Sequence, residues 1–297
     1  MSSIPHIGEV FALLTAIVWA FAVILFKKSG ETAHPVALNL FKNVMGAVLL
    51  VPTIYLFNGM EAASSQPKDI WIMLLSGALG IGVADTLFFM CLNRLGAALS
   101  AIVDCLYSPM VIGLAMLWLG EVLSLWQIAG ALLIIMAVFE ATHIKHADHV
   151  ARSRMWMGVL WGALAMAANA VGIVIVKPIL ETGSLLWVTE IRLLGGIAIL
   201  LVMLALNRNR VPILKSLMIE RGWGWVLSGS FTGAYLAMIV WLAGMKYTQA
   251  SQAAALNQTS NVFVFVFAWI FLKERMTKQR VIGIGLAIIG VYLVTFG

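Results

Sequence analysis

This chain of 297 residues contains ten long apolar stretches, which constrain its fold more than any other feature. Most of them hold the roughly 20 residues that a helix needs to cross about 30 Å of hydrocarbon. Their apolar residues are continuous rather than alternating, which argues against membrane-spanning strands. Hydrophobic residues make up 62% of the chain and charged residues 11%, whereas a soluble domain carries about 25% charged residues. We therefore expect an all-α membrane protein with ten transmembrane helices at approximately Gly8 to Phe26, Val36 to Phe57, Ile70 to Leu92, Ala97 to Leu119, Leu123 to Thr142, Trp156 to Val176, Leu186 to Leu206, Trp223 to Met245, Ala250 to Leu272 and Val281 to Phe296.

The stretches form two groups of five, and landmark residues of the first group recur 150 to 153 positions later in the second. Such pairs in the same order, at nearly constant spacing, indicate duplication and fusion. Because each half holds an odd number of spans, we expect two inverted five-helix repeats at residues 1–142 and 156–297, joined by a linker at 143–155. The matching landmarks are Lys27 and Lys177, Lys42 and Arg192, the Leu-Ser-Gly triplets ending at Gly77 and Gly229, Glu121 and Glu274, and Gly130 and Gly283.

The basic residues predict an orientation in the membrane. Of the 19 Lys and Arg residues, 14 lie in the connections after odd-numbered spans and 3 in those after even-numbered spans. The positive-inside rule then places both termini outside the cytoplasm, in a multi-pass protein of the cytoplasmic (inner) membrane. The net charge of +6 is explained by these connections, so no nucleic-acid partner is expected. No basic residue precedes the first span, which favours a retained helix over a cleaved signal peptide.

With these landmarks, the chain resembles the EamA family of the drug/metabolite transporter superfamily. The resemblance rests on the segment from Leu95 through Ser108-Pro109 to Gly130 and on its second copy from Ala250 to Gly290. It implies a secondary transporter, an exporter of a small organic metabolite or drug, with a central cavity between the halves. Many members of that family keep both termini in the cytoplasm, opposite to the charge count here. Asn261-Val262 replaces Ser108-Pro109, so the proline kink is expected in the first copy alone.

Ionisable side chains within hydrocarbon are costly, by about 2.5 to 3.5 kcal/mol each, so those retained usually have a partner or a task. Lys42 and Asp104 lie at similar depths near the cytoplasmic side, which predicts an ion pair and a gate. Arg192 and Asn257 hold the equivalent places near the opposite face, as a second gate around a midplane site. Asp104 is the first candidate for proton coupling and Asp85 the second. A static interhelical bridge, or a Lys42 side chain that reaches the headgroups, is the alternative.

Polar and aromatic residues inside the spans are candidates to line the cavity. Asn257, Gln258 and Asn261 form a polar ladder at helical spacing, which serves either to bind a polar substrate or to join helices. The aromatic side chains either stack on a ligand or pack against neighbours. The remaining candidates are Asn39, Asn43, Asn169, Trp19, Tyr107, Tyr235 and Trp241.

No enzyme signature is present in the sequence: there is no phosphate-binding glycine loop, nucleophile elbow or zinc-binding helix motif. His143, His146 and His149 fit an ordinary linker facing anionic lipid better than a metal site, so neither a metal nor a cofactor is expected. The expected partners are a small-molecule substrate and membrane lipid, and a monomer is compatible with the sequence. Three alternatives stay open: a lipid flippase, a membrane sensor or scaffold that transports nothing, and an intramembrane enzyme.

Overall fold

Seven apolar stretches of 22 to 31 residues form helices long enough to cross a membrane in the part of the chain that the structure describes. The computed structural model describes residues 6–57, 66–119, 124–142, 149–218 and 222–296. These ranges contain helices and no strands. The elements are α1 (Ile7–Ser29), α2 (Pro35–Leu56), α3 (Pro67–Gly77), η1 (Ala78–Val83), α4 (Ala84–Leu95), α5 (Ala97–Asp104), α6 (Tyr107–Leu119), α7 (Leu125–Ala141), α8 (His149–Thr182), α9 (Leu185–Leu206), α10 (Arg210–Lys215), η2 (Ser216–Met218), α11 (Trp223–Ser230), η4 (Phe231–Ala237), α12 (Met238–Tyr247), α13 (Ala250–Asn257), α14 (Ser260–Leu272) and α15 (Lys278–Phe296).

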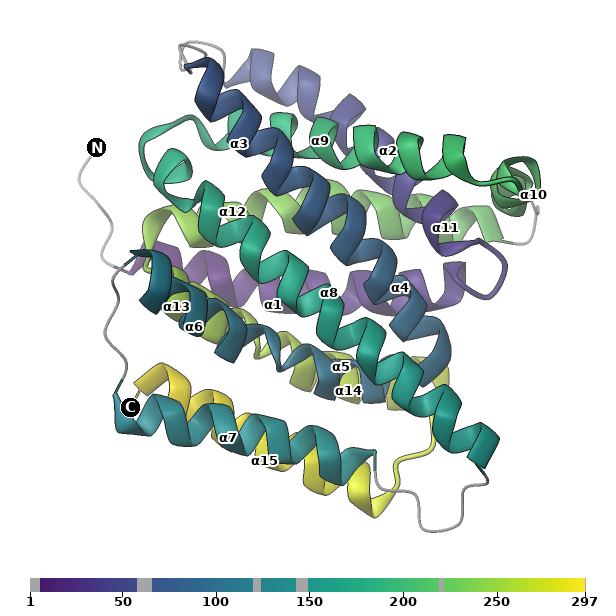
Figure 1. Cartoon of the computed structure of the whole chain (residues 1–297), viewed down its shortest axis with the longest axis vertical. Helices are drawn as coiled ribbons and strands as arrows, with labels where there is room; N and C mark the ends of the chain where they lie inside the picture. The colour runs from purple at the N-terminus through teal and green to yellow at the C-terminus, as the bar shows by residue number, and fades with distance from the viewer. Residues whose placement is uncertain (1–5, 58–65, 120–123, 143–148, 219–221, 297) are drawn as a thin grey trace.

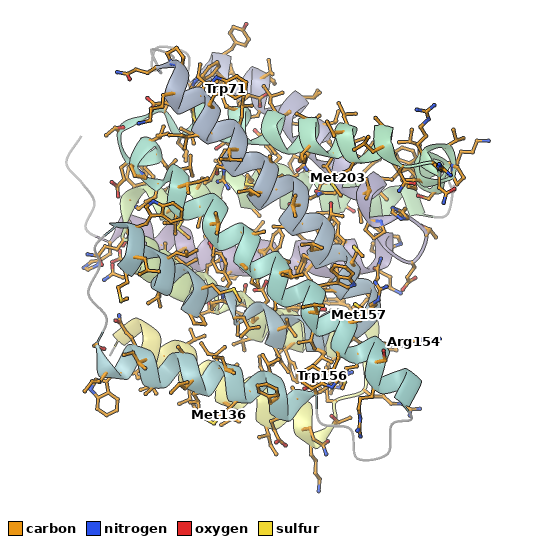
Figure 2. The ribbon with its side chains drawn as sticks, in the orientation of Figure 1. Trp71, Met136, Arg154, Trp156, Met157 and Met203 are labelled. Atoms are coloured by element: carbon orange, nitrogen blue, oxygen red, sulfur yellow. The ribbon has the colours of Figure 1, made fainter. Side chains whose placement is uncertain are left out.

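The outer surface of the bundle is apolar, as lipid contact requires. Side chains such as Trp71 and Met136 point away from the helices (Figure 2), and they are 71% and 53% exposed. Buried polar groups such as Asn39 and Arg192 lie inside instead. This arrangement is the reverse of a soluble protein's and follows from a hydrocarbon solvent.

Two long continuous helices, called rods below, each contain a π-helical segment. The segment η1 lies between α3 and α4, and η4 lies between α11 and α12. The two segments begin 153 positions apart, so they are equivalent under the sequence repeat. A π turn leaves backbone carbonyls without their usual helical donors. In the first rod the Asn39 amide supplies donors, to the carbonyl oxygens of Ile81 at 2.9 Å and Gly82 at 3.0 Å.

Two further spans are broken in the middle. The stretch Ala97 to Leu119 divides into α5 and α6 at Cys105 and Leu106, and the stretch Ala250 to Leu272 divides into α13 and α14 at Gln258 and Thr259. The expectation of a kink in the first copy alone was therefore wrong. Pro109 is the third residue of α6, where its missing N–H has no helical acceptor to lose, so the break does not depend on it.

The two breaks contact each other. The Gln258 amide donates to the carbonyl oxygen of Asp104 at 3.3 Å, and the Asn261 amide donates to Cys105 Sγ at 3.4 Å and to the side chain of Gln258. Gln258 and Asn261 thus join the broken helices of the two halves. Of the two interpretations of the polar ladder, helix joining describes these two residues.

The two halves pack on each other through equivalent pairs of helices: the first helix of each half packs on the π-containing helix of the other half. Helix α1 of the first half packs on α11 and α12, and α8 of the second half packs on α3 and α4. Helix α2 packs on α9, and α5 packs on α14. The α7 and α15 pair lies side by side at the edge of the bundle (Figure 1). The interior between the halves is therefore lined by α1, α2, α4 and their counterparts.

Connections after odd-numbered spans meet at one end of the bundle. Glu274 accepts hydrogen bonds from the backbone N–H groups of Ala97 and Ala98 at 2.7 and 3.1 Å, and the His34 N–H donates to Ser216 Oγ at 2.8 Å. At another set of connections, the Lys177 ammonium donates to the carbonyl oxygens of Met245 and Thr248. Cations that bind carbonyls at helix ends are a common way to satisfy them.

Candidate functional site

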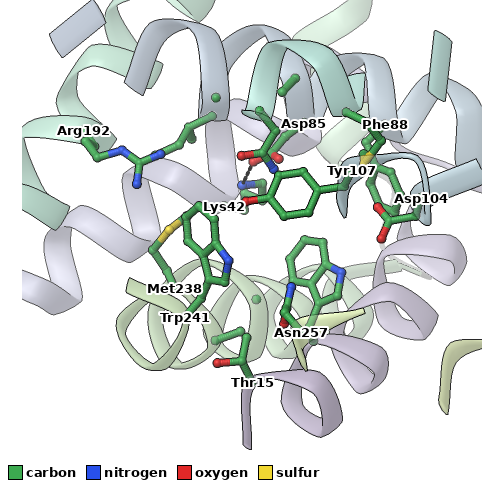
Figure 3. Close-up of a pocket in the computed structure, with 18 residues that line it drawn as sticks. Thr15, Lys42, Asp85, Phe88, Asp104, Tyr107, Arg192, Met238, Trp241 and Asn257 are labelled. Carbon is green, nitrogen blue, oxygen red and sulfur yellow. Dashed lines mark hydrogen bonds and ion pairs between the residues drawn. The ribbon is translucent and has the colours of Figure 1, made fainter. Parts of the chain in front are cut away.

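A central cavity lies where the broken and π-containing helices meet, with about 750 Å³ of space free of protein atoms, including its opening. Figure 3 shows aromatic, charged and amide side chains converging on it. Both halves of the chain contribute residues to its lining. The lining residues are Thr15, Trp19, Lys42, Gly80, Ile81, Ala84, Asp85, Phe88, Asp104, Tyr107, Met166, Asn169, Arg192, Gly233, Ala237, Met238, Trp241 and Asn257.

Most of the lining consists of repeat mates, residues that occupy equivalent places in the two halves. The offsets are the 150 and 153 positions seen in the sequence. Chemical character is retained in some pairs and lost in others, so the two sides of the cavity differ. The pairs are Trp19 and Asn169, Lys42 and Arg192, Gly80 and Gly233, Ala84 and Ala237, Asp85 and Met238, Phe88 and Trp241, and Asp104 and Asn257.

Lys42 forms a buried ion pair with Asp85. Its Nζ lies 2.7 Å from Asp85 Oδ2 and donates to Asn43 Oδ1 at 2.9 Å, and the Lys42 side chain is 2% exposed. The expected pair with Asp104 is thus replaced by one with Asp85. The reason is packing: α2 contacts α4 directly, so Asp85 is presented to Lys42. Asn43 in turn donates to Asn39 Oδ1 at 2.9 Å, which holds this side of the cavity rigidly.

Arg192, the repeat mate of Lys42, has no such partner among the residues that the structure describes. It is fully buried, and its Nε, Nη1 and Nη2 atoms make no hydrogen bond there. Its guanidinium carbon lies 5.4 Å from the centre of the Trp241 ring, a cation–π distance. Met238 stands where the first half has Asp85, so the carboxylate that neutralises Lys42 has no counterpart on this side.

Glycines let the helices approach closely enough to place Arg192 at the cavity. A Cβ atom on Gly77 would lie 1.8 Å from the Arg192 carbonyl oxygen, so α3 and α9 touch backbone to backbone. A Cβ atom on Gly80 would lie 3.3 Å from Arg192 Nη2 and 3.7 Å from Asn169 Oδ1. A side chain at position 80 would therefore crowd the guanidinium. Close crossings at small residues are typical of helices in membranes.

Three more buried polar atoms at the cavity accept or donate no hydrogen bond within the described ranges. They are Tyr107 Oη, Asn169 Oδ1 and Asn257 Oδ1. Asn257 ends α13 and Tyr107 begins α6, so both sit at the helix breaks, where half-helix ends carry partial charges. Buried polar groups are normally paired, and unpaired ones call for a ligand or water. The cavity is thus lined by polar groups that the protein itself leaves unsatisfied.

The sequence matches the EamA-like transporter family over residues 6–141 and 156–296. The chain belongs to this family. It is 21% identical over 284 residues, 95% of each chain, to an uncharacterized transporter of Archaeoglobus fulgidus, and 26% identical over 135 residues to the uncharacterized transporter YoaV of Bacillus subtilis. The second alignment spans about half of each chain, 46%. A crystal structure of a protein 16% identical, with a TM-score of 0.69 over 97% of this chain and 96% of that one, shares the fold.

Family membership and the apolar helices make this chain a multi-pass membrane protein of the EamA-like transporter family. The structure brings several of the predicted site residues together around one cavity, from helices that are far apart in the sequence. These residues are Trp19, Lys42, Asp85, Asp104, Tyr107, Asn169, Arg192, Trp241 and Asn257.

Five other predicted site residues of this EamA-like chain lie away from the central cavity. Asn39 and Asn43 brace the Lys42 side, as described above. The Tyr235 hydroxyl lies 2.7 Å from Thr53 Oγ1, in a separate cluster of apolar side chains. Gln258 and Asn261 join the breaks and line a second, more apolar hollow beside α15. Sequence spacing could not predict the direction in which each of these side chains faces.

Sequence reasoning missed Phe88, Met238 and Thr15, which also line the cavity. A signal for the first two existed. An offset of 153 maps Phe88 onto Trp241 and Asp85 onto Met238, so extending the repeat to these positions would have found both. Thr15 has no such signal, because its hydroxyl donates to the Phe11 carbonyl oxygen at 2.8 Å like many helical threonines.

Proposed function

We propose that this protein is a secondary transporter that exports a small organic solute across the cytoplasmic membrane by alternating access. The observation that carries this proposal is the central cavity, which both halves line and whose buried polar groups include several without a hydrogen-bond partner among the described residues. Transporters built from repeats bind substrate at such an interface, between discontinuous helices. No enzymatic activity, metal or cofactor is part of the proposal.

We infer ten membrane spans that form two inverted repeats. The rods α3–η1–α4 and α11–η4–α12 each count as one span, as do the broken helices α5–α6 and α13–α14. The exchanged packing of α1 on α12 and of α8 on α4 supports an inverted relation between the halves. The two halves could then rock against each other around the cavity, which opens it to one side of the membrane at a time.

The orientation follows from the basic connections. Residues near Arg94, Arg210 and Lys273 would face the cytoplasm, and both termini would lie outside. Glu274 accepts hydrogen bonds from the Ala97 and Ala98 N–H groups, which supports a shared side of the membrane for these two connections.

Asp104 is the proposed proton-coupling residue. It lines the cavity and forms no ion pair within the described part of the chain, whereas Asp85 is held by Lys42. A carboxylate without a fixed cation can bind and release a proton as the cavity opens and closes. Asp104→Asn is expected to weaken the pH dependence of transport, and an unchanged pH dependence would remove Asp104 from this role.

A stability screen tests the proposal. The purified protein in detergent would be heated in the presence of amino acids, nucleosides, cofactors, drugs, organic acids and lysolipids. A ligand at 100 times its dissociation constant stabilises the folded state by about 2.7 kcal/mol. Stabilisation by one chemical class of soluble compounds supports a solute transporter. Stabilisation by lipids alone would indicate a flippase, and stabilisation by nothing would favour a sensor or scaffold.

A further inference from the structure

We propose that Arg192 binds the carboxylate of an organic anion, so that the solute of this transporter is an organic acid with an apolar or aromatic body. This inference rests on the proposed function and specifies its substrate class. It starts from the contrast between two buried cations at the same cavity, Lys42 and Arg192.

The burial of Arg192 demands a partner. A guanidinium carries five N–H donors and stays charged in proteins, and a buried charge without a partner costs several kcal/mol. All three nitrogen atoms of Arg192 lack a hydrogen-bond acceptor among the described residues, and the side chain is fully buried. The missing partner must therefore reach it through the cavity that it lines.

The acidic residues of the cavity form no ion pair or hydrogen bond with Arg192 in the described part of the chain. Asp85 is engaged by Lys42 Nζ at 2.7 Å. Asp104 lies on the opposite side of the close-up from Arg192 (Figure 3), and no ion pair joins them in the described part of the chain. Met238 and Trp241 lie beside Arg192 in the same view. A ligand anion would thus supply to Arg192 the negative charge that Asp85 supplies to Lys42.

The surroundings indicate a carboxylate on an apolar body. A guanidinium binds a carboxylate through two parallel hydrogen bonds, which requires open space along its edge. A Cβ atom at Gly80 would lie 3.3 Å from Nη2, so the glycine keeps side-chain atoms of η1 away from that edge. Trp241, Trp19 and Phe88 supply aromatic walls on which a flat or apolar body would pack.

Met238 provides the decisive variant, because it is the repeat mate of Asp85. Met238→Asp would place a carboxylate where it neutralises Arg192 from within the protein, and Met238→Asn would add a group of nearly the same shape without charge. Both variants keep Arg192 itself. The probes are phenylacetate, indole-3-acetate and hexanoate, each paired with its neutral amide, and sodium chloride at equal ionic strength.

Thermal stabilisation of the purified protein is the readout. Carboxylates are expected to stabilise the wild type, and amides and chloride are not. Met238→Asp should bind carboxylates about tenfold to a hundredfold more weakly than Met238→Asn, the size of a charge-assisted hydrogen bond. Arg192→Lys should bind more weakly than wild type, since it loses the paired geometry.

Three results would overturn the inference: no stabilisation by any carboxylate, equal stabilisation by the amides or by chloride, or equal carboxylate binding in Met238→Asp and Met238→Asn. If neutral or cationic compounds of the broader screen stabilise the protein while carboxylates do not, the transporter proposal stands and the anion site falls. If no soluble compound stabilises it, both fall together.

Discussion

Lys42 Nζ and Asp85 Oδ2 lie 2.7 Å apart in a pair of side chains that are 2% and 13% exposed. Removing one partner of such a pair leaves an uncompensated charge in a place that water hardly reaches. We expect Lys42→Met to lower the free energy of unfolding by about 3 to 5 kcal/mol. The double variant Lys42→Met/Asp85→Leu should recover most of that loss, because two apolar residues of similar volume often replace a buried ion pair without cost. Thermal unfolding of the purified variants measures both values, and a double variant no more stable than Lys42→Met would show that the pair is not the cause.

Gly77 allows α3 and α9 to meet backbone to backbone. Its Cβ position lies 1.8 Å from the Arg192 carbonyl oxygen, so Gly77→Ala must push the two helices apart. We expect a loss of about 1 to 3 kcal/mol in the free energy of unfolding, the usual cost of overpacking. Gly113 is a matched control, since nothing lies within 4 Å of its Cβ position. Gly113→Ala should be neutral or stabilising, because alanine favours helix more than glycine does. Equal effects of the two substitutions would contradict the close crossing.

Glu274 caps the first turn of α5 from the other half of the chain. Its two carboxylate oxygens accept hydrogen bonds from the Ala97 and Ala98 N–H groups. Glu274→Ala removes the cap and should cost about 0.5 to 2 kcal/mol, as the loss of other helix caps does. Glu274→Gln should cost less than Glu274→Ala because it keeps one acceptor oxygen. It should still cost something, because it loses the negative charge that favours a helix N-terminus. If the two variants unfold at the same temperature as wild type, the cap contributes nothing.

The predicted orientation can be checked with single cysteines. A cysteine at Arg210 should resist an impermeant thiol reagent added outside intact cells, because the odd-numbered connections are expected in the cytoplasm. A cysteine at Thr182, the exposed last residue of α8, should react readily. The native Cys91 and Cys105 are both buried, so they should give little background. The opposite labelling pattern would reverse the orientation.

The repeat was the most informative part of the sequence, but it did not predict which side chains pair or where helices break. An offset of 150 pairs Lys42 with Arg192. The sequence placed them in two gates near opposite faces, and in the structure both are buried and line one cavity. The offset could not predict that Lys42 forms its ion pair with Asp85 rather than with Asp104, because helix packing determines which carboxylate contacts Lys42. No proline lies at the break between α13 and α14, so this break could not be predicted from a proline. Side-chain contacts of Gln258 and Asn261 join it to the break between α5 and α6. The π-helical segments η1 and η4 also lacked a sequence signal beyond their glycines.

Solute counterflow tests the central claim most directly. Proteoliposomes would be loaded with the unlabelled compound that stabilises the protein best and diluted into a trace of the labelled compound. A carrier whose cavity opens to one side at a time exchanges solute across the membrane, so labelled compound should accumulate transiently above its equilibrium level. Liposomes without protein should show no such overshoot. Uptake that matches empty liposomes, for every compound that stabilises the protein, would contradict the proposal that this cavity carries a solute across the membrane.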